Sequence, residues 1–143
     1  MKKKTISLIG LIALSSVILF IAACGSGSSN AGMTIISGAA GNNLTATISS
    51  ADGMLRKGQQ EFTLTFSDAS GKPVDVGAVA LNNHMAAMGS MAPMNNAATL
   101  TTTGTPGVYR GKINVEMAGE WQGQITYEGA AGKGSFSLPI IAK

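Results

Sequence analysis

The part of the sequence best equipped for chemistry is a short segment rich in methionine. Residues 82–96 contain four of the eight methionines and the only histidine. The spacing of three between the methionines predicts a tight 3₁₀-like turn with the sulfur atoms along one edge, and Gly89 and Pro93 argue against a long α-helix. We therefore expect a structured loop between strands. Its candidate metal ligands are His84, Met85, Met88, Met91 and Met94.

These side chains favour a copper site. Thioether sulfur is a soft ligand that favours Cu(I), and imidazole suits both oxidation states of copper and also zinc. Thioethers need no deprotonation to bind a metal, and they do not form disulfides in an oxidising compartment. The leading hypothesis is a Cu(I) site made of His84 with two or three of the methionines.

Two alternatives stay open for the same segment. The methionines can fill a gap in the core, which is their usual role, or they can present an apolar surface to a partner protein. Burying one methionine stabilises a fold by about 1.5–3 kcal/mol. Four methionines left in water therefore forgo an amount comparable to the total stability of a small domain, about 5–15 kcal/mol. Their neighbours are mostly small or polar, which weakens the core hypothesis.

The N-terminal residues predict export from the cytoplasm. Lys2, Lys3 and Lys4 are basic and residues 6–23 are mainly apolar, which is the order of a secretory signal. The last residues of the run, followed by Cys24, resemble a bacterial lipobox, in which the cysteine thiol receives a diacylglyceryl group and becomes the mature N-terminus. The alternative is an uncleaved transmembrane anchor, because the apolar run is nearly long enough to span a bilayer.

The segment after Cys24 is rich in glycine and serine and is typical of a flexible tether. We expect a signal peptide over 1–23, a lipidated cysteine and tether over 24–32, and one domain over 33–143. Two or three acyl chains hold a protein on a membrane almost permanently. Gly25 is not the aspartate that commonly retains such proteins at an inner membrane, so the prediction is an outer membrane or periplasmic face in a two-membrane cell, and the cell membrane otherwise.

Composition excludes several classes of function. Lys2, Lys3 and Lys4 account for the net charge of +3, and the rest of the chain has seven basic and seven acidic residues, so no nucleic-acid surface is expected. Cys24 is the only cysteine, which leaves no internal disulfide and no thiolate ligand. No nucleophile elbow or paired carboxylates accompany His84, so we expect no enzymatic activity.

Alternation of apolar and polar residues predicts an all-β domain. The clearest strands are expected over 62–67, 109–117, 121–127 and 136–140, and weaker ones over 33–37, 44–50, 74–81 and 98–103. Turns rich in glycine and proline separate them. We predict an immunoglobulin-like antiparallel β-sandwich of seven or eight strands. Met117 and Trp121 are expected to pack in its core.

Several short motifs, taken in order, resemble the YtkA-like domain, which is related to FixH-type proteins. The resemblance covers roughly residues 60–139. Its motifs are Phe62-Thr-Leu-Thr-Phe66, Gly71-Lys-Pro-Val74, His84-Met-Ala-Ala-Met-Gly89, Pro106-Gly-Val-Tyr109 and Met117-Ala-Gly-Glu-Trp121.

This resemblance implies a small exported or membrane-attached β-sandwich whose methionine loop handles copper near oxidase assembly or metal efflux. The implied ligands are His84, Met85 and Met88, with Met91 and Met94 as additions. The implied partners are a copper transporter, an oxidase assembly factor or another envelope protein.

Overall fold

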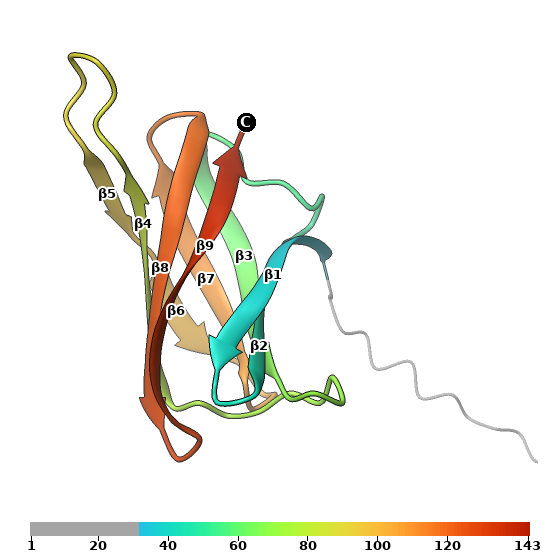
Figure 1. The fold of residues 1–143 in the computed structure, drawn as a ribbon. Helices are drawn as coiled ribbons and strands as arrows, with labels where there is room; N and C mark the ends of the chain where they lie inside the picture. Colours follow the sequence, from blue (N-terminus) through green and yellow to red (C-terminus); the bar gives the residue numbers. More distant parts are fainter. Residues whose placement is uncertain (1–31) are drawn as a thin grey trace, which may run out of the picture.

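The computed structural model describes residues 32–143, which form nine β-strands in two antiparallel sheets and no helix (Figure 1). The strands are β1 (Met33–Gly41), β2 (Leu44–Ser50), β3 (Gly58–Ser67), β4 (Ala78–Met85), β5 (Met94–Ala97), β6 (Thr99–Thr102), β7 (Val108–Val115), β8 (Gly119–Gly129) and β9 (Gly132–Ala142). Within residues 32–143, no segment is a helix of the length and hydrophobicity needed to cross a membrane.

The two sheets confirm the predicted antiparallel β-sandwich. One sheet has the order β1-β2-β3-β7-β6, and the other has the order β5-β4-β8-β9. The strand that the sequence pattern did not predict is β5, which is only four residues long and follows the methionine segment. The chain passes from one sheet to the other at Ala98, whose N–H donates to the Leu81 carbonyl at 2.9 Å.

One predicted strand was displaced along the chain. The pattern placed it over 74–81, whereas β4 begins at Ala78 and continues to Met85. The prediction was wrong at its start because residues 68–77 carry the chain across from one sheet to the other, and the apolar Val76 is buried in this crossing without being part of a strand.

The core lies between the sheets and is built from alternate residues of each strand, as strand geometry requires. Trp121 is almost fully buried, and its indole Nε1–H donates to the Met117 carbonyl at 3.0 Å. The side chain of Met117 is half-buried and packs against the core, as predicted. The largest fully buried side chains are Trp121, Phe66, Leu64, Ile125, Val76, Val115 and Asn83.

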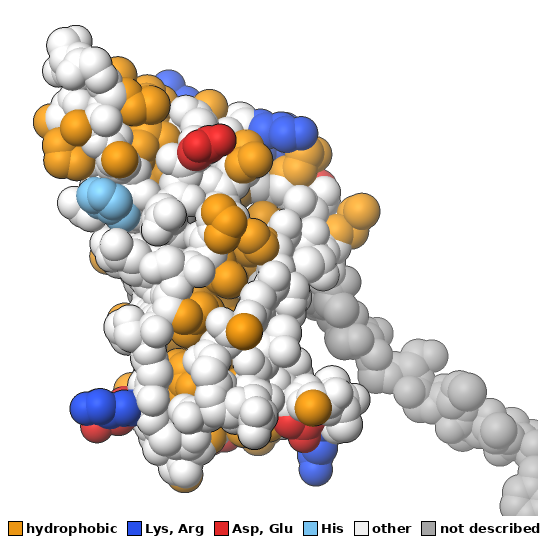
Figure 2. Space-filling view, viewed as in Figure 1, with side chains coloured by type: hydrophobic (Ala, Val, Ile, Leu, Met, Phe, Trp, Pro, Cys, Tyr) orange, Lys and Arg blue, Asp and Glu red, His pale blue; other side chains and the backbone are white. Residues whose placement is uncertain are grey.

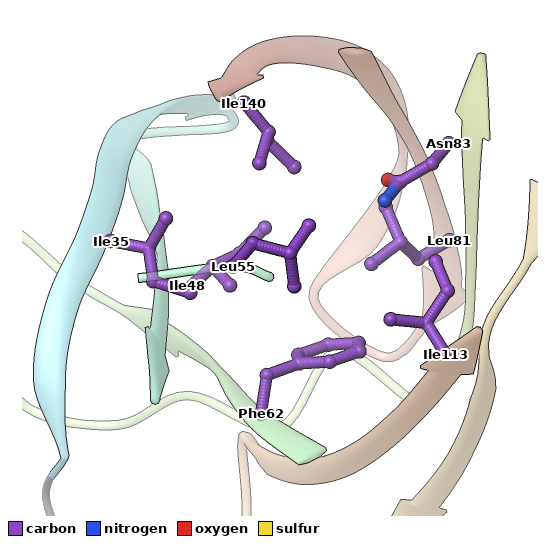
Figure 3. A pocket seen from close by; sticks show the side chains of 8 residues that line it. All are labelled: Ile35, Ile48, Leu55, Phe62, Leu81, Asn83, Ile113 and Ile140. Atoms are coloured by element: carbon purple, nitrogen blue, oxygen red, sulfur yellow. The ribbon is translucent and has the colours of Figure 1, made fainter. Parts of the chain in front are cut away.

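Asn83 is the polar member of this core. Its amide faces a small cavity of about 10 Å³ between the sheets, which is at the lower limit for one water molecule (Figure 3). The other side chains around the cavity are apolar: Ile35, Ile48, Leu55, Phe62, Leu81, Ile113 and Ile140. The cavity is therefore too small and too apolar to bind a larger ligand.

The strand directions give the sandwich two distinct ends. At one end β1 begins, β9 finishes and the β4–β5 hairpin projects beyond the sheets (Figure 1). We call this the hairpin end. At the opposite end lie the β1–β2 turn, the β8–β9 turn and the crossing over 68–77.

Candidate functional site

The methionine segment forms a β-hairpin. Met85 at the end of β4 pairs with Met94 at the start of β5, and an isolated bridge pairs Met88 with Met91. Both pairs belong to the same register, so the hairpin continues past the ends of the strands. The predicted 3₁₀-like turn was wrong, because the backbone pairs across the hairpin instead of closing a helical turn.

A two-residue turn closes the hairpin at Gly89 and Ser90. The Met88 N–H donates to the Met91 carbonyl at 3.2 Å, and the Met91 N–H donates to the Met88 carbonyl at 2.9 Å. Gly89 has a φ of +57°, and Ser90 does not share this conformation. Glycine with positive φ at the first position is the requirement of a type II′ turn, whose twist matches that of paired strands. The turn therefore holds the two methionines directly opposite each other.

Burial divides the four methionines into two pairs. Met85 is 2% exposed and belongs to the core, and its methyl group lies against Gly119, where an added Cβ would be only 3.0 Å away. Met94, its partner across the hairpin, is half-buried and packs against the core. In contrast, Met88 is 51% exposed and Met91 is 44% exposed. Of the two pairs, only Met88 and Met91 are largely exposed to solvent.

His84 lies on the outer face of β4, between Asn95 of β5 and Gln122 of β8. Its Nδ1 lies 2.9 Å from Oδ1 of Asn95. Because an amide oxygen only accepts, Nδ1 carries the proton and donates it, which leaves Nε2 of the neutral ring as the unprotonated nitrogen. Asn82 Nδ2 also donates to the same oxygen, at 3.4 Å, and helps to orient it. This is how metal-binding histidines are commonly held by a second residue.

The imidazole and the exposed methionines share one face of the hairpin. Met88 follows His84 by four residues, and an even separation directs both side chains to the same face of a strand. At about 3.3 Å per residue their Cα atoms are about 13 Å apart. Figure 2 shows the single histidine beside the hydrophobic side chains of the projecting hairpin. The structure thus brings together Met88 and Met91, with His84 further down the same face.

The remaining predicted residues lie elsewhere. Met85 and Met94 point toward the core side of the hairpin, away from His84. Cys24, the signal peptide and the tether up to residue 31 lie outside the described residues. Within residues 32–143, no three His, Cys, Asp or Glu side chains come together in a way that could hold a metal ion. Within the hairpin itself, residues 78–97, the candidate soft or borderline donors are the four thioethers and one imidazole.

Asn95 is the residue that sequence reasoning missed. Its contact with His84 crosses the hairpin, so no local motif contains both. A weak signal was present, because each lies five residues from the nearer of the two turn residues, Gly89 and Ser90. Locating the turn at those two residues would have predicted the pair, but the spacing of the methionines suggested a helical turn instead.

Comparison with known proteins gives one match. A family model described as YtkA-like matches residues 38–126, which is more than half of the chain. The matched region runs from β1 into β8 and includes the whole β4–β5 hairpin. No curated protein and no solved structure matches the chain significantly.

Proposed function

The chain belongs to the YtkA-like family, and from this membership we propose that it is an extracytoplasmic lipoprotein that binds Cu(I) through the tip of its β4–β5 hairpin. The ligands are the thioethers of Met88 and Met91, with Nε2 of His84 as the third donor. Copper is the cargo, which the protein holds or passes to another envelope protein.

The observation that carries the proposal is the exposed pair Met88 and Met91. Two residues that exchange both backbone hydrogen bonds have Cα atoms about 5.5 Å apart, so their side chains emerge side by side. Each leaves about half of an apolar side chain in water, although burial would stabilise the fold. A pair of neighbouring soft donors in solvent is a suitable arrangement for capturing Cu(I).

His84 supports the proposal through the tautomer of its ring. In the neutral imidazole, the hydrogen bond from Nδ1–H to Asn95 leaves the lone pair on Nε2, which is the nitrogen that faces away from Asn95. Because the Cα atoms of His84 and Met88 are about 13 Å apart, their two donors are at the limit of their reach, and binding by His84 requires the hairpin to bend toward β4. Met85 supports the hairpin from the core side and is not needed as a ligand.

The N-terminal residues supply the proposed location. A lipid on Cys24 holds the domain on a membrane outside the cytoplasm. The glycine- and serine-rich residues that follow act as a tether between the lipid and the domain. The relation to FixH-type proteins belongs to the same proposal. It suggests a copper transporter or an oxidase assembly factor as the partner that receives the metal.

The test is an anaerobic titration of the full-length lipoprotein, purified in detergent, with Cu(I) in competition with a chromophoric chelator. The wild-type protein binds one Cu(I). The double variant Met88→Leu, Met91→Leu keeps the apolar volume but removes both sulfur atoms, and it loses at least tenfold in affinity, or about 1.4 kcal/mol. The matched control is Met33→Leu, because Met33 is 65% exposed and lies outside the hairpin. Equal affinity of the double variant and the control would refute the copper proposal.

The rival hypothesis uses the same exposed tip as a docking surface for a membrane protein, without metal. It predicts that the leucine double variant keeps its partner, because leucine preserves the apolar contact. It also predicts that copper chelators leave the complex intact. The copper hypothesis predicts that the double variant loses its partner.

A further inference from the structure

The large apolar side chains that remain exposed are all at one end of the sandwich. Within residues 32–143 they are Met33, Met88, Met91 and Ile141. Met33 begins β1, Ile141 lies one residue before the end of β9, and the two hairpin methionines project beyond both. The hairpin end therefore carries all of the exposed large apolar side chains of residues 32–143.

The opposite end has a different character. Its turns carry mainly small and charged residues, and the exposed charged ones include Lys72, Asp75, Glu128 and Lys133. Figure 2 shows acidic and basic side chains at this lower end of the molecule. Exposed charged side chains occur at both ends, including Asp52, Arg56 and Glu120 at the hairpin end, so the two ends of the described domain differ in the exposed large apolar side chains, which lie at the hairpin end.

The chain enters the domain at the hairpin end. Met33 is nine residues from Cys24, and nine residues span at most about 30 Å when fully extended. Strand β1 begins at Met33 and carries the chain about 26 Å toward the opposite end over its nine residues. With a lipid on Cys24, the hairpin end can therefore meet the bilayer without full extension of the tether, whereas the opposite end meets it only when the tether is almost fully extended.

The hairpin has the dimensions of a shallow membrane contact. From Met85 to Met88 it extends three residues, or about 10 Å, beyond the end of β4. Apolar groups of interfacial proteins reach about 5–10 Å into the boundary between headgroups and acyl chains.

We propose that the domain stands on the lipid bilayer with its hairpin end down, so that Met88 and Met91 touch the membrane interface. The proposal rests on the lipid anchor of the proposed function. In this orientation the metal-binding tip lies at the membrane surface, next to a membrane-embedded partner, and not in the surrounding solution. The contact is reversible, because only a few side chains make it.

The test measures the distance of each end from the membrane in the full lipidated chain. Single cysteines are introduced at Ser90→Cys and Ala130→Cys, which occupy matched two-residue turns at the hairpin end and the opposite end. Each is labelled with a fluorophore, since the lipidated Cys24 has no reactive thiol. The protein is reconstituted into vesicles of phosphatidylethanolamine and phosphatidylglycerol that contain lipids with a nitroxide on the headgroup.

We expect quenching at position 90 to exceed quenching at position 130 severalfold. Adding Met88→Ser and Met91→Ser to the Ser90→Cys protein reduces its quenching, because the apolar contact is removed. Equal quenching at the two ends, stronger quenching at position 130, or recovery of the protein away from the vesicles would overturn the proposal. So would unchanged quenching in the serine variant. Copper affinity is measured separately in detergent, so loss of the copper proposal leaves this result interpretable.

Discussion

The sharpest prediction concerns the different roles of Met85 and Met88, which are three residues apart. Met85 is 2% exposed and its methyl group lies against Gly119, whereas Met88 is 51% exposed at the turn. Truncation of a buried methionine to alanine removes transfer energy and leaves a cavity, which together cost about 2–5 kcal/mol. Truncation at an exposed site usually changes stability by no more than about 0.5 kcal/mol.

These free energies translate into thermal shifts. For a domain of about 110 residues, each kcal/mol lowers Tm by about 4 °C. Met85→Ala is therefore expected to lower Tm by about 8–20 °C, and Met88→Ala by about 2 °C or less. Thermal unfolding followed by circular dichroism in the absence of metal measures both values. Urea unfolding gives the free energies without relying on the conversion.

Copper binding should follow the opposite pattern. Met85→Leu conserves volume, costs less than about 1.5 kcal/mol, and leaves Cu(I) affinity unchanged, whereas the double leucine variant at Met88 and Met91 loses affinity but keeps its Tm. The division of the methionines into core and ligand pairs is wrong if Met85→Leu weakens copper binding as much as the double variant. It is also wrong if Met85→Ala and Met88→Ala shift Tm equally.

Three further predictions concern single contacts. Asn95→Ala removes the acceptor that orients His84 and should weaken Cu(I) binding by about 10- to 100-fold, with Tm as the control for folding. Gly111→Ala should destabilise the domain by about 1–3 kcal/mol in urea, because an added Cβ would clash with the ring of Phe62, its partner on the adjacent strand β3. Burial raises the pKa of Tyr109, and nearby Asp75 raises it further, so its contribution to stability is full below pH 10 and is lost as the pH rises through the higher folded-state pKa. Tyr109→Phe should cost about 1 kcal/mol at neutral pH and flatten this alkaline loss in a pH series of unfolding curves.

Much of the fold was predictable from local patterns. Alternation in the stretches around Phe62, Ile113 and Trp121 identified central strands, because those strands have one face in the core and one in water. The missed strand β5 has the pattern of neither a buried nor an alternating apolar strand, since its sequence is Met-Asn-Asn-Ala. Strand β5 forms because it pairs with β4, and nothing in its own four residues indicates this pairing.

The sequence by itself determined which chemical groups are available. Methionine and histidine in one segment fix soft, neutral donors as the only candidates there, whatever shape the segment takes. The alternation of strands likewise determined an all-β domain with its core between sheets. Both conclusions depend on residue type and short-range order, which are properties of the chain before it folds.

Only the tertiary structure decided which donors can act together. A spacing of three residues suits a helical turn, but in a hairpin it sends Met85 and Met88 to opposite faces. Which face becomes buried depends on how β4 packs against β8 and on the other sheet, far away in the sequence. Register across the turn then pairs Met88 with Met91 and His84 with Asn95, because pairing in a sheet is set between strands and not within one.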